Sequence, residues 1–146
     1  LSWLEEPLSA DDITGYEQLA LHSSVPLATG EHHQGLVELT PFFNSKCCAV
    51  VQPDLAMMGG ITETMRVATI AGYHGLVVAP HFLPSLFVHL AAAAPAINWL
   101  EHFPLLEPLF DSPVDVDESG FLSPPDLLGH GLSWGSGARD EFKITT

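Results

Sequence analysis

Short apolar runs alternate with longer amphipathic stretches over the first hundred residues of the chain. The apolar runs are residues 1–4, 25–28, 47–51, 76–79 and 97–100. Runs of this length suit strands, and their nearly continuous apolar character is typical of parallel strands buried on both faces. The pattern therefore predicts repeated strand–helix units and a parallel sheet, the organisation of an α/β protein.

The stretches between the runs carry helix signals. The first begins after Asp11–Asp12, which can cap a helix, and Tyr16, Leu19 and Leu21 supply its expected buried face. The other expected helices cover residues 36–44, 61–71 and 85–94.

The amino-acid composition of the chain changes after Pro104. Pro, Gly, Ser and Asp become frequent, as in residues 111–113 and 123–126, and they predict loops and short strands. We therefore expect two parts: strand–helix units over residues 1–104, and an irregular segment over residues 105–146 that packs on another part of the protein.

Composition limits the classes of protein that fit. The 146 residues suffice for one domain, and no apolar run reaches the roughly 18 residues of a membrane span. The chain opens without an initiator Met or a signal peptide, inside an expected strand, so we expect a fragment of a longer protein.

Charge and cysteine content exclude further classes. Four basic residues against 18 acidic ones leave a net charge of -14, and nucleic acid or an anionic membrane needs clustered Lys and Arg. Cys47 and Cys48 are adjacent, which disfavours a disulfide between them, and no CxxC spacing suggests zinc. We expect small buried strand residues in a reducing compartment, and by default the cytoplasm.

Each apolar run ends in a carboxylate or an imidazole. These residues are Glu5, Glu31, Asp54, His81 and Glu101, and they recur every 20 to 27 residues. In a β/α barrel the carboxyl ends of all strands meet at one mouth, where the active site lies. The spacing therefore predicts part of a β/α barrel whose reactive side chains share one centre.

The two glutamates suit a divalent metal. Glu5 and Glu31 would lie at neighbouring strand ends, where two carboxylates repel unless a cation lies between them, and oxygen ligands suit Mg²⁺. Glu5–Glu6 taken alone reads equally well as a solvated charge pair. Two acidic ligands make an incomplete site, so a third ligand is expected from elsewhere.

Asp54 and His81 suit proton transfer. A carboxylate beside an imidazole fixes its tautomer and stabilises the imidazolium, as a general base requires. The alternative for His81 is a hydrogen-bonded core histidine. Glu101 could, if protonated, donate a hydrogen bond to a substrate oxyanion.

The remaining histidines carry less weight. His32 and His33 lie beside the proposed ligand Glu31 and are candidates for substrate contact. The others are expected on surfaces or in packing roles: His22, His74, His89, His102 and His130.

Several short motifs resemble a known family in their order and spacing. They are Trp3-Leu4-Glu5-Glu6-Pro7, Gly30-Glu31-His32, Gln52-Pro53-Asp54 with Gly59-Gly60, Pro80-His81, Asn98-Trp99-Leu100-Glu101 and the stretch from Pro125 to Gly131. Together they resemble the barrel domain of the enolase superfamily, in its mandelate racemase subgroup, over essentially the whole chain. The resemblance implies the C-terminal half of a TIM-type barrel, with about five strands in this chain.

The resemblance also implies roles for the residues at the strand ends. Glu5 and Glu31 would be the second and third Mg²⁺ ligands, Asp54 and His81 the proton-transfer dyad, and Glu101 would assist at the substrate carboxylate. A lysine-bearing motif, the first metal-ligand Asp and the N-terminal capping domain precede these motifs in the subgroup and are absent here. We therefore expect the protein's own N-terminal segment to supply them, the C-terminal segment to pack on the capping domain, and the protein to form a homo-oligomer.

The stretch from Glu31 to His33 is similar to acid-sugar dehydratases, rhamnonate dehydratase among them. The leading hypothesis is a Mg²⁺-dependent lyase that abstracts the α-proton of a sugar acid and eliminates water, inactive as this fragment alone. A racemase or epimerase of a 2-hydroxy acid, which would use the same enediolate chemistry, is the alternative reaction. A non-catalytic fragment or binding module is the alternative to an enzyme. A metal hydrolase built on the histidines fits less well, because they lack paired His-x-x-x-His spacing.

Overall fold

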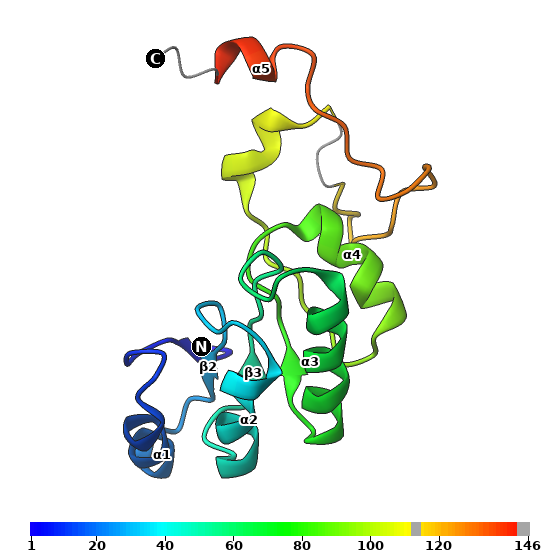
Figure 1. The fold of residues 1–146 in the computed structure, drawn as a ribbon. Helices are drawn as coiled ribbons and strands as arrows, with labels where there is room; N and C mark the ends of the chain where they lie inside the picture. The colour runs from blue at the N-terminus through cyan, green and yellow to red at the C-terminus, as the bar shows by residue number, and fades with distance from the viewer. Residues whose placement is uncertain (112–114, 143–146) are drawn as a thin grey trace.

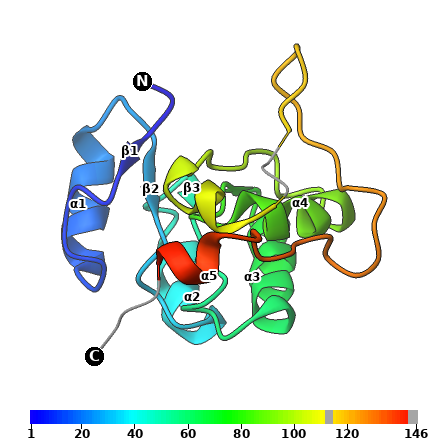
Figure 2. The ribbon, with the colours of Figure 1, turned by 90° about the horizontal axis from the view of Figure 1, so that it is seen from above.

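A computed structural model describes residues 1–111 and 115–142 of the chain (Figure 1). Its first part alternates strands and helices, as the apolar pattern predicts. The order is β1 (Leu4–Glu5), α1 (Ile13–His22), β2 (Leu27–Thr29), α2 (Leu36–Ser45), β3 (Val50–Val51), α3 (Ile61–Tyr73), β4 (Val77–Val78) and α4 (Pro84–Ala93). Seen from above, the helices follow one another in an arc around the strands (Figure 2).

The four strands form one parallel sheet in the order β1-β2-β3-β4. Each strand pairs with the next one in sequence, so each intervening helix makes one crossover between neighbouring strands. This simple progression is how the wall of a β/α barrel is built. The chain is therefore a part of such a barrel, as predicted.

The two faces of the sheet carry different side chains because residues alternate along each strand. Leu27, Val51 and Val78 belong to the larger apolar cluster, in which they pack with buried helix residues such as Phe43 and Phe87. A second, smaller cluster contains Ala28, Val50 and Ala79, with Trp3 and Val77 packed against it. The second cluster marks the face of the sheet turned away from the helices, which is the inner face of the barrel.

The start of α1 follows the predicted chemistry. The Asp12 carboxylate accepts a hydrogen bond from the Gly15 backbone N–H at 2.9 Å, which satisfies a donor in the first turn. Tyr16 is fully buried and Leu19 packs against the core, but Leu21 is 73% exposed. The prediction for Leu21 was wrong, because residue 21 lies about 140° around the helix from Tyr16.

The fifth apolar run does not form a strand. Ile97 makes a single parallel bridge with Val78, held by hydrogen bonds from Val78 N to Ala96 O at 2.9 Å and from Asn98 N to Val78 O at 3.2 Å. Directly before this bridge the chain makes a turn, in which the Ile97 N–H donates to Ala94 O at 3.0 Å, so the ladder does not extend further towards α4. The prediction of a strand over residues 97–100 was therefore too long.

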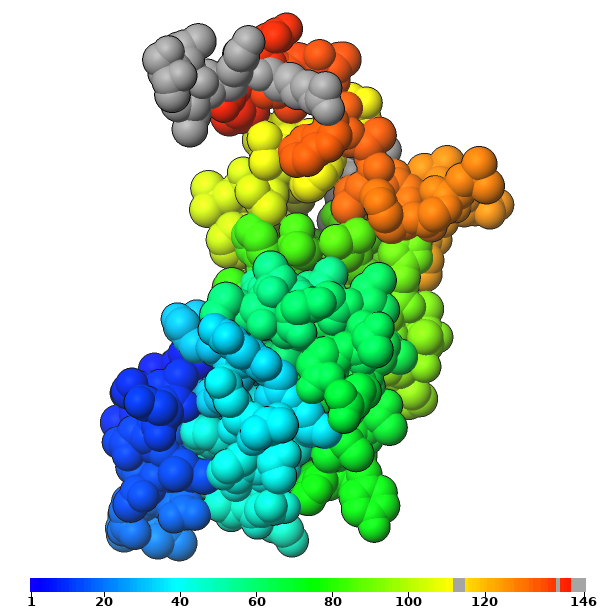
Figure 3. Space-filling view, viewed as in Figure 1, coloured from blue at the N-terminus to red at the C-terminus, as the bar shows by residue number. Residues whose placement is uncertain are grey.

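The described part of the segment after Pro104 is mostly irregular. It contains the 3₁₀-helix η1 (Pro104–Leu109) and α5 (Ala138–Glu141), which the sequence did not predict, and two isolated antiparallel bridges in place of short strands. The bridges join Phe110 to Trp134 and Val116 to Leu122. In the space-filling view this segment, yellow to red, lies above the strand–helix part (Figure 3). Its packing on a capping domain stays a prediction.

The two adjacent cysteines lie in the protein interior. Cys47 and Cys48 are free and buried just before β3, and burial raises the pKa of the Cys48 thiol to about 12. Within the described residues no helix is both long and apolar enough to cross a membrane.

Candidate functional site

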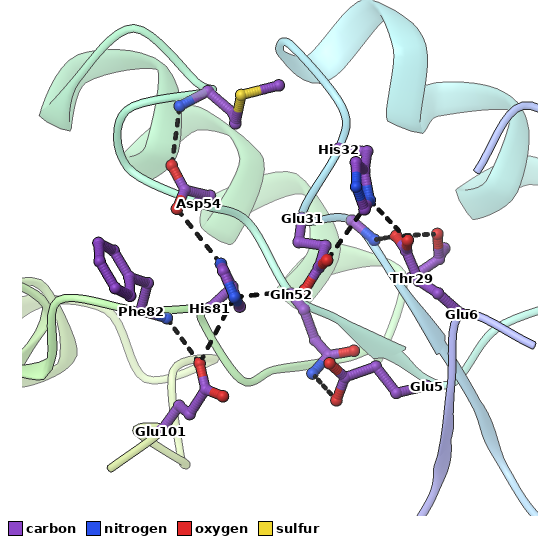
Figure 4. A network of polar contacts seen from close by, with 12 residues as sticks. Glu5, Glu6, Thr29, Glu31, His32, Gln52, Asp54, His81, Phe82 and Glu101 are labelled. Atoms are coloured by element: carbon purple, nitrogen blue, oxygen red, sulfur yellow. Dashed lines mark hydrogen bonds and ion pairs between the residues drawn. The ribbon is translucent and has the colours of Figure 1, made fainter. Parts of the chain in front are cut away.

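Polar side chains gather at the carboxyl ends of the strands (Figure 4). The network joins residues far apart in the sequence, because the ends of parallel strands lie side by side. Its labelled members are Glu5, Glu6, Thr29, Glu31, His32, Gln52, Asp54, His81, Phe82 and Glu101. All five residues that the sequence places at strand ends therefore lie in one network.

Asp54 is held by its own turn. Its Oδ1 accepts hydrogen bonds from the backbone N–H groups of Ala56 at 2.7 Å and Met57 at 2.8 Å. With Oδ1 engaged, Oδ2 faces the next strand end, where His81 Nδ1 lies 3.3 Å away. The carboxylate is buried and has little freedom to rotate.

His81 lies between this carboxylate and two others. Its backbone N–H donates to Pro53 O at 3.2 Å, and Asp54 and His81 form a parallel bridge that continues the ladder beyond β3 and β4. With Nδ1 facing Asp54, the other ring nitrogen, Nε2, lies 3.4 Å from Glu31 Oε2 and 3.9 Å from Glu101 Oε2. An Nδ1–H donated to the aspartate leaves the Nε2 lone pair free to accept a proton.

Glu101 lies on the other side of His81 and supports the loop after it. Its Oε2 accepts a hydrogen bond from the Phe82 backbone N–H at 2.7 Å. Phe82 and Leu83 both adopt left-handed backbone conformations, with φ of 65° and 48°, which are unusual for residues with side chains. The Glu101 contact helps to hold this strained turn next to the imidazole.

Aromatic rings shield one side of the imidazole. The Phe82 ring stacks on His81 with 5.7 Å between ring centroids, and Phe103 meets Phe82 edge-on at 4.7 Å. Phe103 also lies 6.2 Å from the His81 ring. These rings were not predicted as part of the site, because their role depends on the turn at residues 82–83.

Glu6 links the ends of β1 and β2. Its Oε1 accepts hydrogen bonds from Thr29 Oγ1 and from the Gly30 backbone N–H, both at 3.2 Å, and its Oε2 lies 2.7 Å from His32 Nδ1. The hydrogen bond and the negative charge of Glu6 raise the pKa of His32. His32 also lies 3.5 Å from Glu31 Oε1, so it borders the network, and its contact with substrate stays a prediction.

His33 is not brought to the network. Its ring is buried, with 5% of the residue exposed, and meets Phe42 edge-on at 5.1 Å between centroids. Burial lowers the pKa of His33, and its Nδ1 has no hydrogen-bond partner among the described residues. The arrangement gives this ring a packing role and does not support the predicted substrate contact.

Glu5 takes part in a separate contact within the network. Its Oε2 accepts a hydrogen bond from Gln52 Nε2 at 2.7 Å. Gln52 opens the Gln52-Pro53-Asp54 motif, but the sequence predicts no role for it. The signal that could have found it is the two-residue alternation along the strand, which places Gln52 and Asp54 on one side of the chain.

The donor set suits a hard divalent cation. One group of three ligand atoms within 4.8 Å of one another occurs in the described part of the chain, and it comprises Glu6, Glu31 and His32. Both oxygens of Glu6 are already engaged, and a histidine nitrogen is a poorer ligand for Mg²⁺ than oxygen. Glu5 and Glu31 offer carboxylate oxygens from neighbouring strand ends and stay the predicted Mg²⁺ ligands.

Among the side chains that the structure describes, no Lys or Arg pairs with this group. Lys46 lies at the end of α2, and Arg66 pairs with Glu63 on α3 at 2.7 Å, outside the network. Five carboxylates therefore lie in this network, and in the described residues their ion-pair partners are His32 and His81. Such a concentration of negative charge favours the binding of a cation.

Comparison with known proteins places this arrangement in a family. The family model described as "Enolase C-terminal domain-like" matches residues 1–138. The chain is 37% identical over 145 residues to the L-talarate/galactarate dehydratase of Salmonella typhimurium, and the match covers 99% of this chain and 36% of that enzyme. The chain thus spans about a third of the length of this curated relative.

Solved structures agree with the family match. L-talarate dehydratase from Polaromonas sp. JS666, complexed with Mg and L-glucarate, aligns with a TM-score of 0.86 and 38% identity over 96% of this chain and 39% of its own. An enolase from alpha proteobacterium BAL199 with bound Mg aligns with a TM-score of 0.90 and 31% identity, covering 97% of this chain and 39% of its own. The family match and the parallel strand–helix order lead to one conclusion: the chain belongs to the enolase C-terminal domain-like family.

Proposed function

We propose that this chain carries part of the active site of a Mg²⁺-dependent acid-sugar dehydratase. The observation that carries the proposal is the position of His81, whose Nδ1 faces Asp54 while its Nε2 faces Glu31 and Glu101. A base oriented by a carboxylate and placed beside candidate metal ligands suits abstraction of a proton next to a substrate carboxylate.

Glu5 and Glu31 would hold the metal ion, together with a ligand from outside this chain. Bound Mg²⁺ supplies a Lewis acid that polarises the substrate carboxylate and stabilises the negative charge that develops there. Glu31 Oε2 lies 3.4 Å from His81 Nε2, so the ligand and the base adjoin the same space. This closeness supports a substrate carboxylate held next to the base.

His81 would transfer the proton in both halves of the reaction. Its Nε2 accepts the α-proton of the sugar acid, and Asp54 stabilises the imidazolium that forms. The same proton then passes to the departing 3-hydroxyl group, which leaves as water. The elimination leaves an enol, which tautomerises to the 2-keto-3-deoxy acid as its hydroxyl proton is lost and C3 is protonated, and His81 returns to its neutral form.

Glu101 and the aromatic rings would complete this side of the site. Glu101 Oε2 is bound to the Phe82 N–H, so its other oxygen is the one free to contact substrate. Phe82 and Phe103 cover the imidazole and limit the access of water to it. Exclusion of water strengthens the electrostatic interactions on which the proton transfer depends.

The relatives indicate which substrates to test first. The complete protein should be incubated with Mg²⁺ and a panel of sugar diacids, including talarate, galactarate and glucarate, and assayed for 2-keto-3-deoxy product. We expect product from at least one of them, and none from a His81→Asn variant that binds Mg²⁺ normally. Solvent deuterium exchange without elimination would instead identify a racemase or epimerase. The absence of both product and exchange with every acid would contradict the proposal.

A further inference from the structure

Gln52 is a buried polar residue at the carboxyl end of β3, with 6% of its surface exposed. Its backbone N–H donates to Thr29 O at 3.0 Å and so continues the ladder between β2 and β3. Val50, two residues earlier, belongs to the cluster on the inner face of the barrel. Alternation along the strand therefore directs the Gln52 side chain to the same inner face.

Glu5 is directed to that face from the other side of β2. It pairs in register with Ala28, which pairs in turn with Val50 in the inner cluster. The side chains of Glu5 and Gln52 thus approach each other across the end of β2, where the intervening residue is Gly30. A Cβ at Gly30 would lie 2.8 Å from Gln52 N, so only glycine allows this close approach.

Only one of the two polar atoms of the Gln52 amide has a hydrogen-bond partner among the described residues. Nε2 donates to Glu5 Oε2 at 2.7 Å, whereas Oε1 is buried and has no partner among the described residues. The reverse orientation of the amide would place two acceptors against each other, so the donor side is fixed by Glu5. A buried acceptor without a donor costs stability, so core packing alone does not account for a polar residue here.

We propose that Gln52 is a positioning residue for the metal site: its amide donor fixes the orientation of the Glu5 carboxylate. This inference rests on the proposed function, in which Glu5 is a Mg²⁺ ligand. A neutral amide orients the carboxylate without cancelling its charge, which a Lys or Arg at position 52 would do. Hydrogen-bond partners of this kind raise metal affinity by holding a ligand in its binding geometry.

The test is Mg²⁺ affinity, measured by calorimetry on the complete protein. Gln52→Met keeps the size of the side chain and removes the donor, and Gln52→Asn keeps an amide that is too short to reach Glu5. We expect both variants to bind Mg²⁺ about 10- to 100-fold more weakly. Their melting temperatures in EDTA should equal that of the wild type, or rise in Gln52→Met because the unpaired oxygen is gone. Gln18→Met, an exposed change on α1, is the matched control and should bind Mg²⁺ normally.

The Glu5→Gln variant separates the two possible failures. If Glu5→Gln weakens Mg²⁺ binding and neither Gln52 variant does, the role of Gln52 is refuted while the proposed function stands. If Glu5→Gln also leaves affinity unchanged, the metal site of the proposed function is refuted together with this inference. A loss of affinity that is matched by a lower melting temperature in EDTA in both Gln52 variants would assign Gln52 a structural role and overturn the proposal.

Discussion

Asp54 divides its two oxygens between its own turn and the imidazole of His81. An Asp54→Asn substitution can keep the contacts of Oδ1 with the backbone N–H groups of Ala56 and Met57. Its amide nitrogen would then face His81 Nδ1 and force that atom to accept, which places the ring proton on Nε2 and removes the base. We expect kcat of the complete enzyme to fall by roughly 10²- to 10⁴-fold.

Mg²⁺ binding provides the control for this variant. Asp54 is not a proposed ligand, so calorimetry should give the wild-type Mg²⁺ affinity for Asp54→Asn. Solvent exchange of the substrate α-proton should slow in parallel with kcat. Exchange at the wild-type rate would show that another group abstracts the proton.

Cys48 gives the fold a pH dependence at the alkaline end. Burial raises its pKa from 9.0 to about 12, so between these values the folded state keeps a proton that the unfolded state has lost. Stability therefore falls as pH rises through this window. We expect the melting temperature of the complete protein in EDTA to drop more steeply from pH 9 to pH 11 than that of Cys48→Ala. Equal slopes would mean that the thiol ionises as readily in the folded protein as in the unfolded chain.

The sequence predicts residues of the site where strand ends determine their position. Asp54 and His81 follow buried apolar runs, and the parallel sheet brings them together as expected. His32 and His33 show the limit of this reasoning, because one borders the network and the other is buried against Phe42. Which of two neighbours faces the site depends on the backbone of the loop, and the apolar pattern contains no information about that.

At the level of elements, the close packing of β2 and β3 depends on Gly30. Its φ of 143° is unfavourable for other residues, and a Cβ would also meet the backbone of Gln52. We expect Gly30→Ala to lower the free energy of unfolding by about 2–4 kcal/mol, from backbone strain and steric conflict together. Gly59→Ala separates the two effects, since Gly59 has a φ of 74° and open space around it.

The comparison of these two glycine variants is made by urea denaturation. Gly59→Ala should lower the free energy of unfolding by only about 1 kcal/mol, because it adds the strain of the left-handed conformation without a steric conflict. Similar losses in the two variants would show that the ends of β2 and β3 can separate without penalty.

The elements themselves follow from the sequence to different degrees. The helices α1 to α4 lie close to their predicted ranges, because apolar periodicity and capping residues such as Asp12 act locally. The strands are shorter than the apolar runs, because a strand ends where its neighbour stops offering hydrogen bonds. The bridge at Ile97 shows this directly: its extent depends on partners outside the run and not on its own residues.

At the scale of the whole molecule, the charge and the strand order have a common explanation. The net charge of -14 includes the carboxylates grouped at the strand ends, and a divalent cation would offset part of their repulsion. The strand order from β1 to β4 places Glu5 and Glu31 at neighbouring positions on that edge. Homo-oligomer formation and a cytoplasmic location stay predictions.

This explanation predicts that Mg²⁺ stabilises the complete protein. A ligand present at 100 times its Kd adds about 2.7 kcal/mol to the free energy of unfolding, because it binds only the folded state. We expect Mg²⁺ to raise the melting temperature of the wild type and to have little effect on Glu31→Gln, which lacks one ligand charge. Glu17→Gln, an exposed change on α1 that removes the same charge far from the strand ends, should respond as the wild type does. Since both variants change the net charge equally, a weak response from both would attribute the effect to overall charge, and a full response from Glu31→Gln would remove Glu31 from the metal site.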